Sequence, residues 1–285
     1  MERPCHEISV SSHAVEIWLD RRLPFEPKGD LLAVRLELRS AIRSLRCPPG
    51  ELLAATYTSL DPATCDAENV LLYNVGSASF AQAALSGIQF ERLHATPPHS
   101  PSGQTYPHHH HYRFVSIASI APALPALSFD LPLDRVSTAT KVHHVWWAAS
   151  GAAAIAAAPL RGNYELDVLV PPQSRPANLT AVIKPLVDGI ICGLHSEILV
   201  DSVAVERLAQ VTGWSAGQIA NRLLSPANPI LGARRLLSSY REFVKWNPAD
   251  DLCQRGSVIV RSDLRPHCTV AVRVPSALPV LVHSR

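Results

Sequence analysis

The sequence predicts a mixed α+β protein with two lobes of similar size. Three observations favour this class. Hydrophobic residues make up 47% of the 285 residues and charged residues 18%, which provides a substantial core and excludes overall disorder. Segments in which apolar and polar residues alternate, typical of half-buried strands, occur in both halves of the chain. Segments with apolar residues at helical spacing lie between and after these strands.

Alternating residues predict four strands. In residues 32–38 and 163–170 every second side chain is apolar, so one face of each strand would be buried. Residues 256–261 and 269–274 alternate in the same way on either side of the turn-like residues 262–266. The sequence therefore predicts a C-terminal β-hairpin.

Four segments have the spacing of helices. In the first, Asn178 is a suitable N-cap, and Pro185 is expected to kink the helix or delay its start. The predicted helices cover residues 179–194, 203–211, 216–224 and 231–245.

Proline-rich stretches indicate how the chain is divided. Residues 95–107 contain four prolines and many small polar residues, which is typical of an exposed connection. We expect an N-terminal α/β lobe over residues 1–95, a Pro-rich linker over 96–135 and a C-terminal α+β lobe over 136–285.

The two halves also share a short pattern. A polar turn that ends in asparagine, at residues 66–69 and again at 175–178, precedes an apolar segment with small residues. Duplicated strand–helix units would produce this pattern, and so would two unrelated β–α units.

Composition and cysteine spacing bound the setting of the protein. The N-terminus lacks the profile of a signal peptide, and the most apolar run, residues 145–160, is too short and interrupted for a membrane span. The six cysteines form no CxxC pair, so we expect reduced thiols in a cytoplasmic protein without membrane contact. The net charge of +2 creates no global basic field, and no P-loop or G-x-G-x-x-G motif occurs.

The second half combines acidic residues with a lysine. Lys184 and Asp188 lie four residues apart on one face of a predicted helix, with Asp167 on the preceding strand and Asp201 after the helix. Clustered carboxylates can hold Mg²⁺ or Mn²⁺, which polarises a phosphate and activates water, while a lysine offsets the negative charge. We therefore take Lys184, Asp188 and Asp201 as candidate catalytic residues, and Asp167, Asp188 and Asp201 as candidate metal ligands. The alternative is a solvated i,i+4 ion pair beside unrelated acids.

The order of motifs over residues 164–208 is distinctive. An alternating strand is followed by Asn178, by Lys184 and Asp188 on a helix, and by Asp201. This order resembles RusA-type Holliday-junction resolvases, in which a strand leads to an Asp-x-Asp-Asn turn, a helix with Lys and a downstream Asp, and an Asp-Asp pair. The resemblance implies a nuclease-like second half.

The chain departs from the family pattern at three points. Arg175 and Ala177 stand where the turn should carry its acids, the lysine comes several residues late, and the Asp-Asp step keeps only one acid. Residues 66–69 (Asp-Ala-Glu-Asn) in the first half read like the missing turn, without a following lysine. These departures imply a divergent half that is either active or inactive as a nuclease.

Residues 205–224 have the spacing of a helix-turn-helix. Ala209, Gly213 and Ile219 occupy its small, glycine and branched apolar positions. The alternative is an ordinary corner between two helices of a larger domain. In the DNA-binding interpretation, the residues expected to contact DNA are Gln218, Arg222, Arg234 and Arg235.

Four consecutive histidines, residues 108–111, stand after the Pro-rich stretch. Imidazoles bind Zn²⁺ or Ni²⁺, but consecutive side chains in regular structure cannot all point at one ion. We expect a solvated loop, and the sequence leaves open whether it binds metal.

The leading hypothesis is a nucleic-acid-associated protein with a RusA-like half, DNA as its partner, and Mg²⁺ or Mn²⁺ as its only cofactor. One alternative is a non-enzymatic DNA-binding protein that uses residues 205–224. Another is a subunit or homodimer that contacts a protein partner through an apolar surface.

Overall fold

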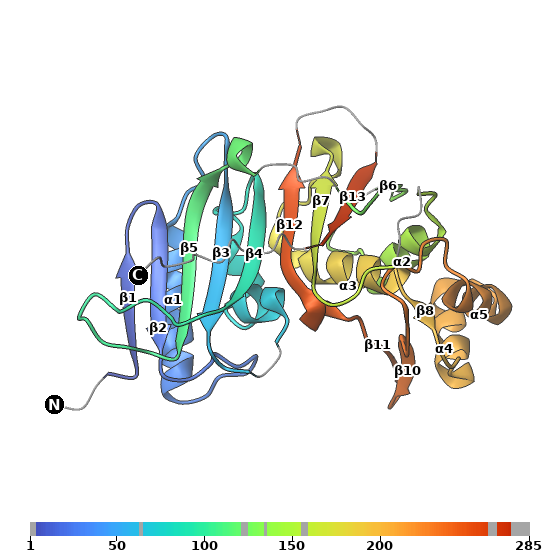
Figure 1. Cartoon of the computed structure of the whole chain (residues 1–285), viewed down its shortest axis with the longest axis horizontal. Coiled ribbons are helices and arrows are strands. Elements are labelled where there is room, and N and C mark those ends of the chain that lie inside the picture. The colour runs from blue at the N-terminus through green and yellow to red at the C-terminus, as the bar shows by residue number, and fades with distance from the viewer. Residues whose placement is uncertain are drawn as a thin grey trace, which may run out of the picture.

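One nine-stranded sheet joins the two halves of the chain (Figure 1). The computed structural model describes residues 4–62, 65–120, 125–133, 136–154, 159–261 and 267–274. The strands of the sheet are β1 (His6–Val10), β2 (Ala14–Leu19), β3 (Glu51–Ser59), β4 (Gly87–His94), β5 (His108–Ser116), β6 (Leu127–Leu131), β7 (Tyr164–Val170), β12 (Cys253–Val260) and β13 (Cys268–Arg273). Their spatial order is β1-β2-β5-β3-β4-β12-β7-β13-β6.

Helices cover one face of this sheet. The longer helices are α1 (Asp30–Ser44), α2 (Val142–Gly151), α3 (Ile183–Gly193), α4 (Ser202–Thr212) and α5 (Ala216–Leu224). Short helical turns are η1 (Asn69–Tyr73), η2 (Ser77–Phe80), η3 (Ile117–Ser119), η4 (Pro172–Ser174), η5 (Leu179–Ala181) and η6 (Asp250–Leu252). Figure 1 shows α1, α2 and α3 behind the sheet, and the main core lies between them and the strands. A mixed sheet with helices on one face is an α+β fold, as predicted.

The two halves follow the same path. In the first, β2, α1, β3, a crossover, β4 and β5 follow one another, and in the second β6, α2, β7, a crossover, β12 and β13 do so. Each unit has its first strand beside its fourth, followed by the second and third, and only the second and third strands are parallel. The units meet where β4 pairs antiparallel with β12. This shared topology supports an internal duplication.

The predicted C-terminal hairpin is wrong. β12 and β13 do not pair with each other, because β7 lies between them, parallel to β12 and antiparallel to β13. The alternation correctly indicated strands, but β7 is apolar on its core face and needs a partner on both edges to satisfy its backbone groups.

Residues 32–38, expected as a strand, lie inside helix α1. Val34, Leu38 and Ile42 are buried at i, i+4 and i+8, whereas Leu36 is 54% exposed. The helix therefore buries every second member of the alternating pattern and leaves the others on its outer side.

Residues 231–245, expected as a helix, form short strands instead. Buried Glu197 accepts hydrogen bonds from the backbone N–H groups of Leu236 (2.9 Å) and Leu237 (3.0 Å), which holds this segment extended. Arg241 turns the chain with φ of 51°. The strands form two pairs, parallel β8 (Ser196–Glu197) with β9 (Ala233–Arg234) and antiparallel β10 (Leu237–Tyr240) with β11 (Phe243–Trp246).

The expected linker over residues 96–135 contains two strands of the sheet, β5 and β6, and is corrected accordingly. The Pro-rich residues 95–107 connect β4 to β5 within the first half. They are mostly exposed, and Glu7 anchors them by accepting hydrogen bonds from Ser100 (2.9 Å) and Tyr106 (3.1 Å). The chain passes from the first unit to the second between β5 and β6.

A smaller core lies beyond the second unit, where α4, α5 and the β10–β11 hairpin pack around Trp146 of α2. This region occupies the crossover between β7 and β12, so it is an insertion into the second unit.

Among the described residues, no helix has both the length and the apolar character needed to cross a bilayer. All six cysteines are free thiols, as expected.

Candidate metal centre and active site

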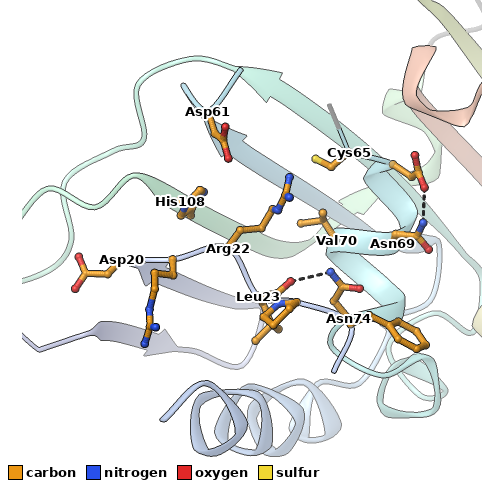
Figure 2. A pocket seen from close by; sticks show the side chains of 13 residues that line it. Asp20, Arg22, Leu23, Asp61, Cys65, Asn69, Val70, Asn74 and His108 are labelled. Carbon is orange, nitrogen blue, oxygen red and sulfur yellow. Dashed lines mark hydrogen bonds between the residues drawn. The ribbon is translucent and has the colours of Figure 1, made fainter. Parts of the chain in front are cut away.

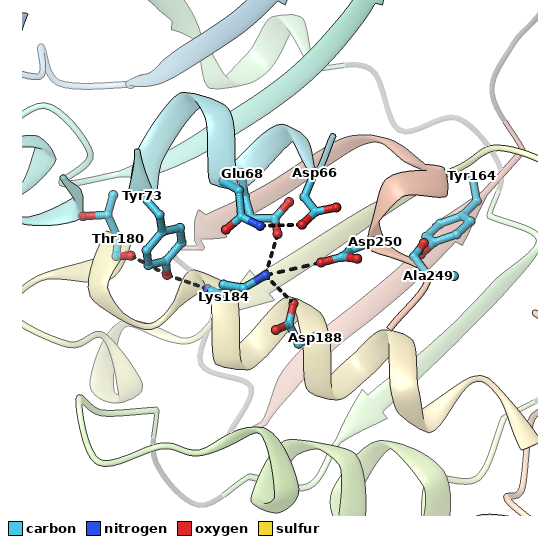
Figure 3. Close-up of polar contacts among 10 residues, drawn as sticks. Asp66, Glu68, Tyr73, Tyr164, Thr180, Lys184, Asp188, Ala249 and Asp250 are labelled. Atoms are coloured by element: carbon cyan, nitrogen blue, oxygen red, sulfur yellow. Dashed lines mark hydrogen bonds and ion pairs between the residues drawn. The ribbon is translucent and has the colours of Figure 1, made fainter. Parts of the chain in front are cut away.

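The crossovers of the two units contact each other on the helix-covered face of the sheet. Thr180 Oγ1 donates a hydrogen bond to the carbonyl oxygen of Ser77 at 2.6 Å. The hydroxyl of Tyr73 donates to the carbonyl oxygen of Thr180 at 3.1 Å and accepts from the backbone N–H of Lys184 at 2.7 Å. Residues of η1 and α3 that lie more than one hundred positions apart therefore form one site (Figure 3).

Lys184 lies at the centre of this site, surrounded by three carboxylates (Figure 3). Its Nζ is 3.1 Å from Glu68 Oε1, 3.2 Å from Asp188 Oδ1 and 3.3 Å from Asp250 Oδ2. Glu68 comes from the first unit, Asp188 from α3, and Asp250 from η6 before β12. Three acids and one lysine leave an excess of negative charge if all are ionised.

Pro185 explains why Lys184 and Asp188 lie here. It occupies the first turn of α3, where the missing N–H is tolerated, so the helix starts at Ile183, later than residue 179. This confirms the expected late start. Asn178 does not cap α3; its side-chain oxygen lies 2.7 Å from Thr180 Oγ1.

Three acids of the site are arranged as metal ligands. Carboxylate oxygens of Asp66, Glu68 and Asp250 lie within 4.8 Å of one another. Asn69 Nδ2 donates a hydrogen bond to Asp66 and fixes its orientation. Glu68 is fully buried, and its Oε2 has no hydrogen-bond partner among the described residues. A buried carboxylate oxygen without a donor is costly, and a divalent cation would satisfy it.

Burial changes the titration of these acids. It raises the pKa of Glu68 to about 8, of Asp188 to about 7 and of Asp250 to about 6, despite the opposing attraction of Lys184. Burial would lower the pKa of Lys184, but the surrounding carboxylates raise it above its usual value. The lysine therefore stays charged, while the acids share protons near neutral pH unless a cation replaces those protons.

The structure does not bring Asp167, Asp188 and Asp201 together, so the predicted ligand set is corrected. Asp167 points to the opposite face of the sheet, where it pairs with Arg273 and accepts a hydrogen bond from Ser257. The reason is strand alternation, because the neighbouring side chains of β7 face the core.

Asp201, predicted as a catalytic residue and ligand, is the N-cap of α4. Its carboxylate accepts from the backbone N–H groups of Ala204 (3.0 Å) and Ser239 (2.9 Å), which accounts for its position. These hydrogen bonds lower its pKa. Lys184 and Asp188 are the predicted residues that do meet in the site.

Asp250 was missed by the sequence analysis, although a signal existed. Asp250 and Asp251 are adjacent in the sequence and resemble the acidic pair expected from the RusA-type pattern. Inserted helices and strands separate this pair from α3, so the two are not neighbours in the sequence.

The residues predicted to bind DNA lie on α5 and in the extended segment that follows it. Gly213 forms the turn between α4 and α5 with φ of 75°. Exposed Gln218 forms a reciprocal N-terminal cap with Ser215, and the guanidinium of Arg222 lies 4.7 Å from the ring centre of Trp147. Arg234 lies in β9. Arg235 forms an ion pair with Asp201, with 3.6 Å between Nη2 and Oδ2.

The histidine run is strand β5, not a solvated loop. His108 and His110 contact Tyr57 on the core side, whereas His109 bonds to Glu16 at 3.0 Å on the other face. Burial lowers the pKa of His110 to about 3. Alternation thus sends successive rings to opposite faces of the sheet.

Comparisons of the chain with protein-family models, with curated proteins and with solved structures give no match.

Proposed function

We propose that this protein is a metal-dependent phosphodiesterase that acts on nucleic acid, with one active site composed from both units. The observation that carries the proposal is the ring of carboxylates around Lys184. Two of these carboxylates, Glu68 and Asp250, also lie within 4.8 Å of Asp66 as candidate metal ligands.

Three segments that resemble the RusA-type motifs contribute residues to this site. The Asp-x-Glu-Asn turn comes from residues 66–69, the lysine and its downstream acid from Lys184 and Asp188, and the acidic pair from residues 250–251. Each unit lacks what the other supplies, because the first has no lysine after its turn and the second has no acids in its turn. Their convergence at one place supports a common function better than any one motif does.

The residues have distinct roles in this proposal. Asp66, Glu68 and Asp250 would hold Mg²⁺ or Mn²⁺, which supplies Lewis-acid stabilisation of the phosphate and a more acidic water. Lys184 remains charged and offsets negative charge on the phosphate. Asp188, with a pKa of about 7, is suited to accept a proton from water near neutral pH.

The duplication implies one active site and one lost site. Arg175 and Ala177 stand in the second unit where Asp66 and Glu68 stand in the first. The counterpart position therefore lacks the acids that a divalent cation needs.

A nuclease assay tests the proposal. The wild-type protein is incubated with branched, double-stranded and single-stranded DNA in Mg²⁺, Mn²⁺ or EDTA. We expect cleavage only with metal, and Asp66→Asn or Glu68→Gln should lower its rate on the order of 10²-fold or more. The matched control Glu206→Gln changes an exposed carboxylate on α4 and should cleave as wild type. Absence of cleavage on all three substrates, or cleavage that survives both site variants, contradicts the proposal.

A second candidate, DNA binding without catalysis, is favoured by the α4–Gly213–α5 corner and the adjacent hairpin. Gel shifts at two salt concentrations test it, since contacts to phosphate weaken as salt rises. Loss of binding in Arg235→Ala, with binding retained in Asp66→Asn, would support this candidate over a substrate complex at the acidic site.

A further inference from the structure

A cavity of about 730 Å³ lies next to the acidic cluster (Figure 2). It is bounded by the loop that follows β2 and by the start of η1. Asp66 lines this cavity and is also one of the three candidate metal ligands. A molecule bound in the cavity would therefore lie beside the metal centre.

Two arginines line the cavity: Arg21 is exposed, and Arg22 is half-buried. Figure 2 shows the Arg22 guanidinium directed between Asp61, Cys65 and Val70, into the space that the lining residues enclose. Its Nη1 is buried and has no hydrogen-bond partner among the described residues. A guanidinium stays charged at physiological pH and can only donate, so a buried N–H without an acceptor is destabilising. Phosphate oxygens are the acceptors that match its planar geometry.

A hydrogen bond from the side chain of Asn74 fixes the backbone next to Arg22. Asn74 Nδ2 donates to the carbonyl oxygen of Leu23 at 2.7 Å, which ties the residue after Arg22 to the end of η1. Two further carboxylates line the cavity, those of Asp20 and Asp61, and each takes part in an interaction within the protein. Asp20 points away from Arg22 in Figure 2.

Phe25 adds a flat apolar surface to the same cavity. Its side chain is 64% exposed, which is unusual for an aromatic residue, while Leu23 and Val70 nearby are buried. An exposed ring can stack on a base of any sequence. A half-buried arginine whose Nη1 lacks an acceptor and an exposed ring line one cavity, and they match the two parts of a nucleotide, its phosphate and its base.

We infer that this cavity binds the nucleotide next to the scissile phosphate. Arg22 binds the phosphate of that nucleotide, and Phe25 stacks on its base. The scissile phosphate of the same nucleic-acid strand would then lie at Asp66 and the metal centre. The position next to the scissile bond rests on the proposed function, whereas nucleotide binding by the cavity can be tested without it.

The test measures binding of a 5′-phosphorylated, fluorescently labelled oligothymidylate by anisotropy in EDTA, where metal-dependent cleavage cannot occur. We expect Arg22→Gln to weaken binding on the order of 10- to 100-fold and Phe25→Ala on the order of 10-fold. Arg43→Gln is the matched control, because it removes the same charge from the exposed side of α1 and should change binding less than about twofold. Inorganic phosphate should compete with the probe, and unphosphorylated thymidine should compete less well.

The outcomes separate the two proposals. Probe affinity that stays within about twofold of wild type in both Arg22→Gln and Phe25→Ala overturns the cavity assignment, even if the protein cleaves DNA. Weakened binding in these variants, without any metal-dependent cleavage by the wild type, retains the nucleotide site and rejects the nuclease. Phe25→Ala changes an exposed side chain, so its result does not depend on a variant that fails to fold.

Discussion

Replacing Glu68 by glutamine should stabilise the metal-free protein while removing its metal response. Glu68 is fully buried, and burial raises its pKa from an ordinary 4.5 to about 8. The folded protein therefore keeps a proton that the unfolded chain releases between these pH values. Stability falls as pH rises through this window, since the folded state binds more protons there.

The size of the effect follows from that pKa. A carboxyl whose pKa rises from 4.5 to about 8 costs about 3 kcal/mol of folding stability at pH 7, and about 5 kcal/mol once it is fully ionised. This pKa already includes the attraction of Lys184. Glutamine keeps an oxygen that can accept from Lys184 and cannot ionise, so Glu68→Gln should recover most of the loss at alkaline pH.

The free energy of unfolding of wild type and Glu68→Gln is measured by urea unfolding in EDTA, followed by circular dichroism, between about pH 5 and pH 9. The wild type should lose stability across this range by several kcal/mol more than Glu68→Gln, whereas the surface control Glu206→Gln should follow the wild type. With Mn²⁺, the wild type should gain stability and Glu68→Gln should not. If the free energies of unfolding of wild type and Glu68→Gln change in parallel with pH, the ionisation of Glu68 does not destabilise the fold and the reasoning is refuted.

The other predictions concern the same site and the seam between the units. Mn²⁺ should raise the Tm of the wild type more as pH increases from about 6 to 8, because its ligands must lose protons, and Asp66→Asn should abolish the rise. Lys184→Met should leave carboxylates unpaired and lower metal-free stability by about 3 kcal/mol at pH 8, with little loss at pH 5, in urea unfolding. Gly256→Ala would place a Cβ 2.2 Å from the ring of buried Phe90, so it should destabilise the β4–β12 seam by about 1–3 kcal/mol, and Phe90→Leu in the same chain should recover part of this.

The local sequence determined several elements of this protein. The alternation in residues 163–170 predicted strand β7, and the spacing around Gly213 predicted the corner between α4 and α5. The i,i+4 spacing of Lys184 and Asp188 predicted their contact, and Pro185 set the start of α3. These features depend on neighbours within one or two turns, so the chain encodes them locally.

Periodicity failed where one pattern suited two structures. In residues 32–38 every second residue is apolar, which fits a strand, yet Val34 and Leu38 also lie four residues apart, as a helix requires. Only the packing of α1 against the sheet decides between these, because it buries Ile42 in the same row. The same holds for β12 and β13, whose common neighbour β7 lies far away in the sequence.

The site itself was decided by the tertiary structure. Glu68 and Asp250 lie 116 and 66 positions from Lys184, and no local pattern connects them. The pairing of β4 with β12 places the crossovers of the two units against each other, which closes the ring of acids around the lysine. Sequence alone supplied the residue types, in three separate motifs. Their charge, burial and pKa became those of one site only when the sheet brought the two units together.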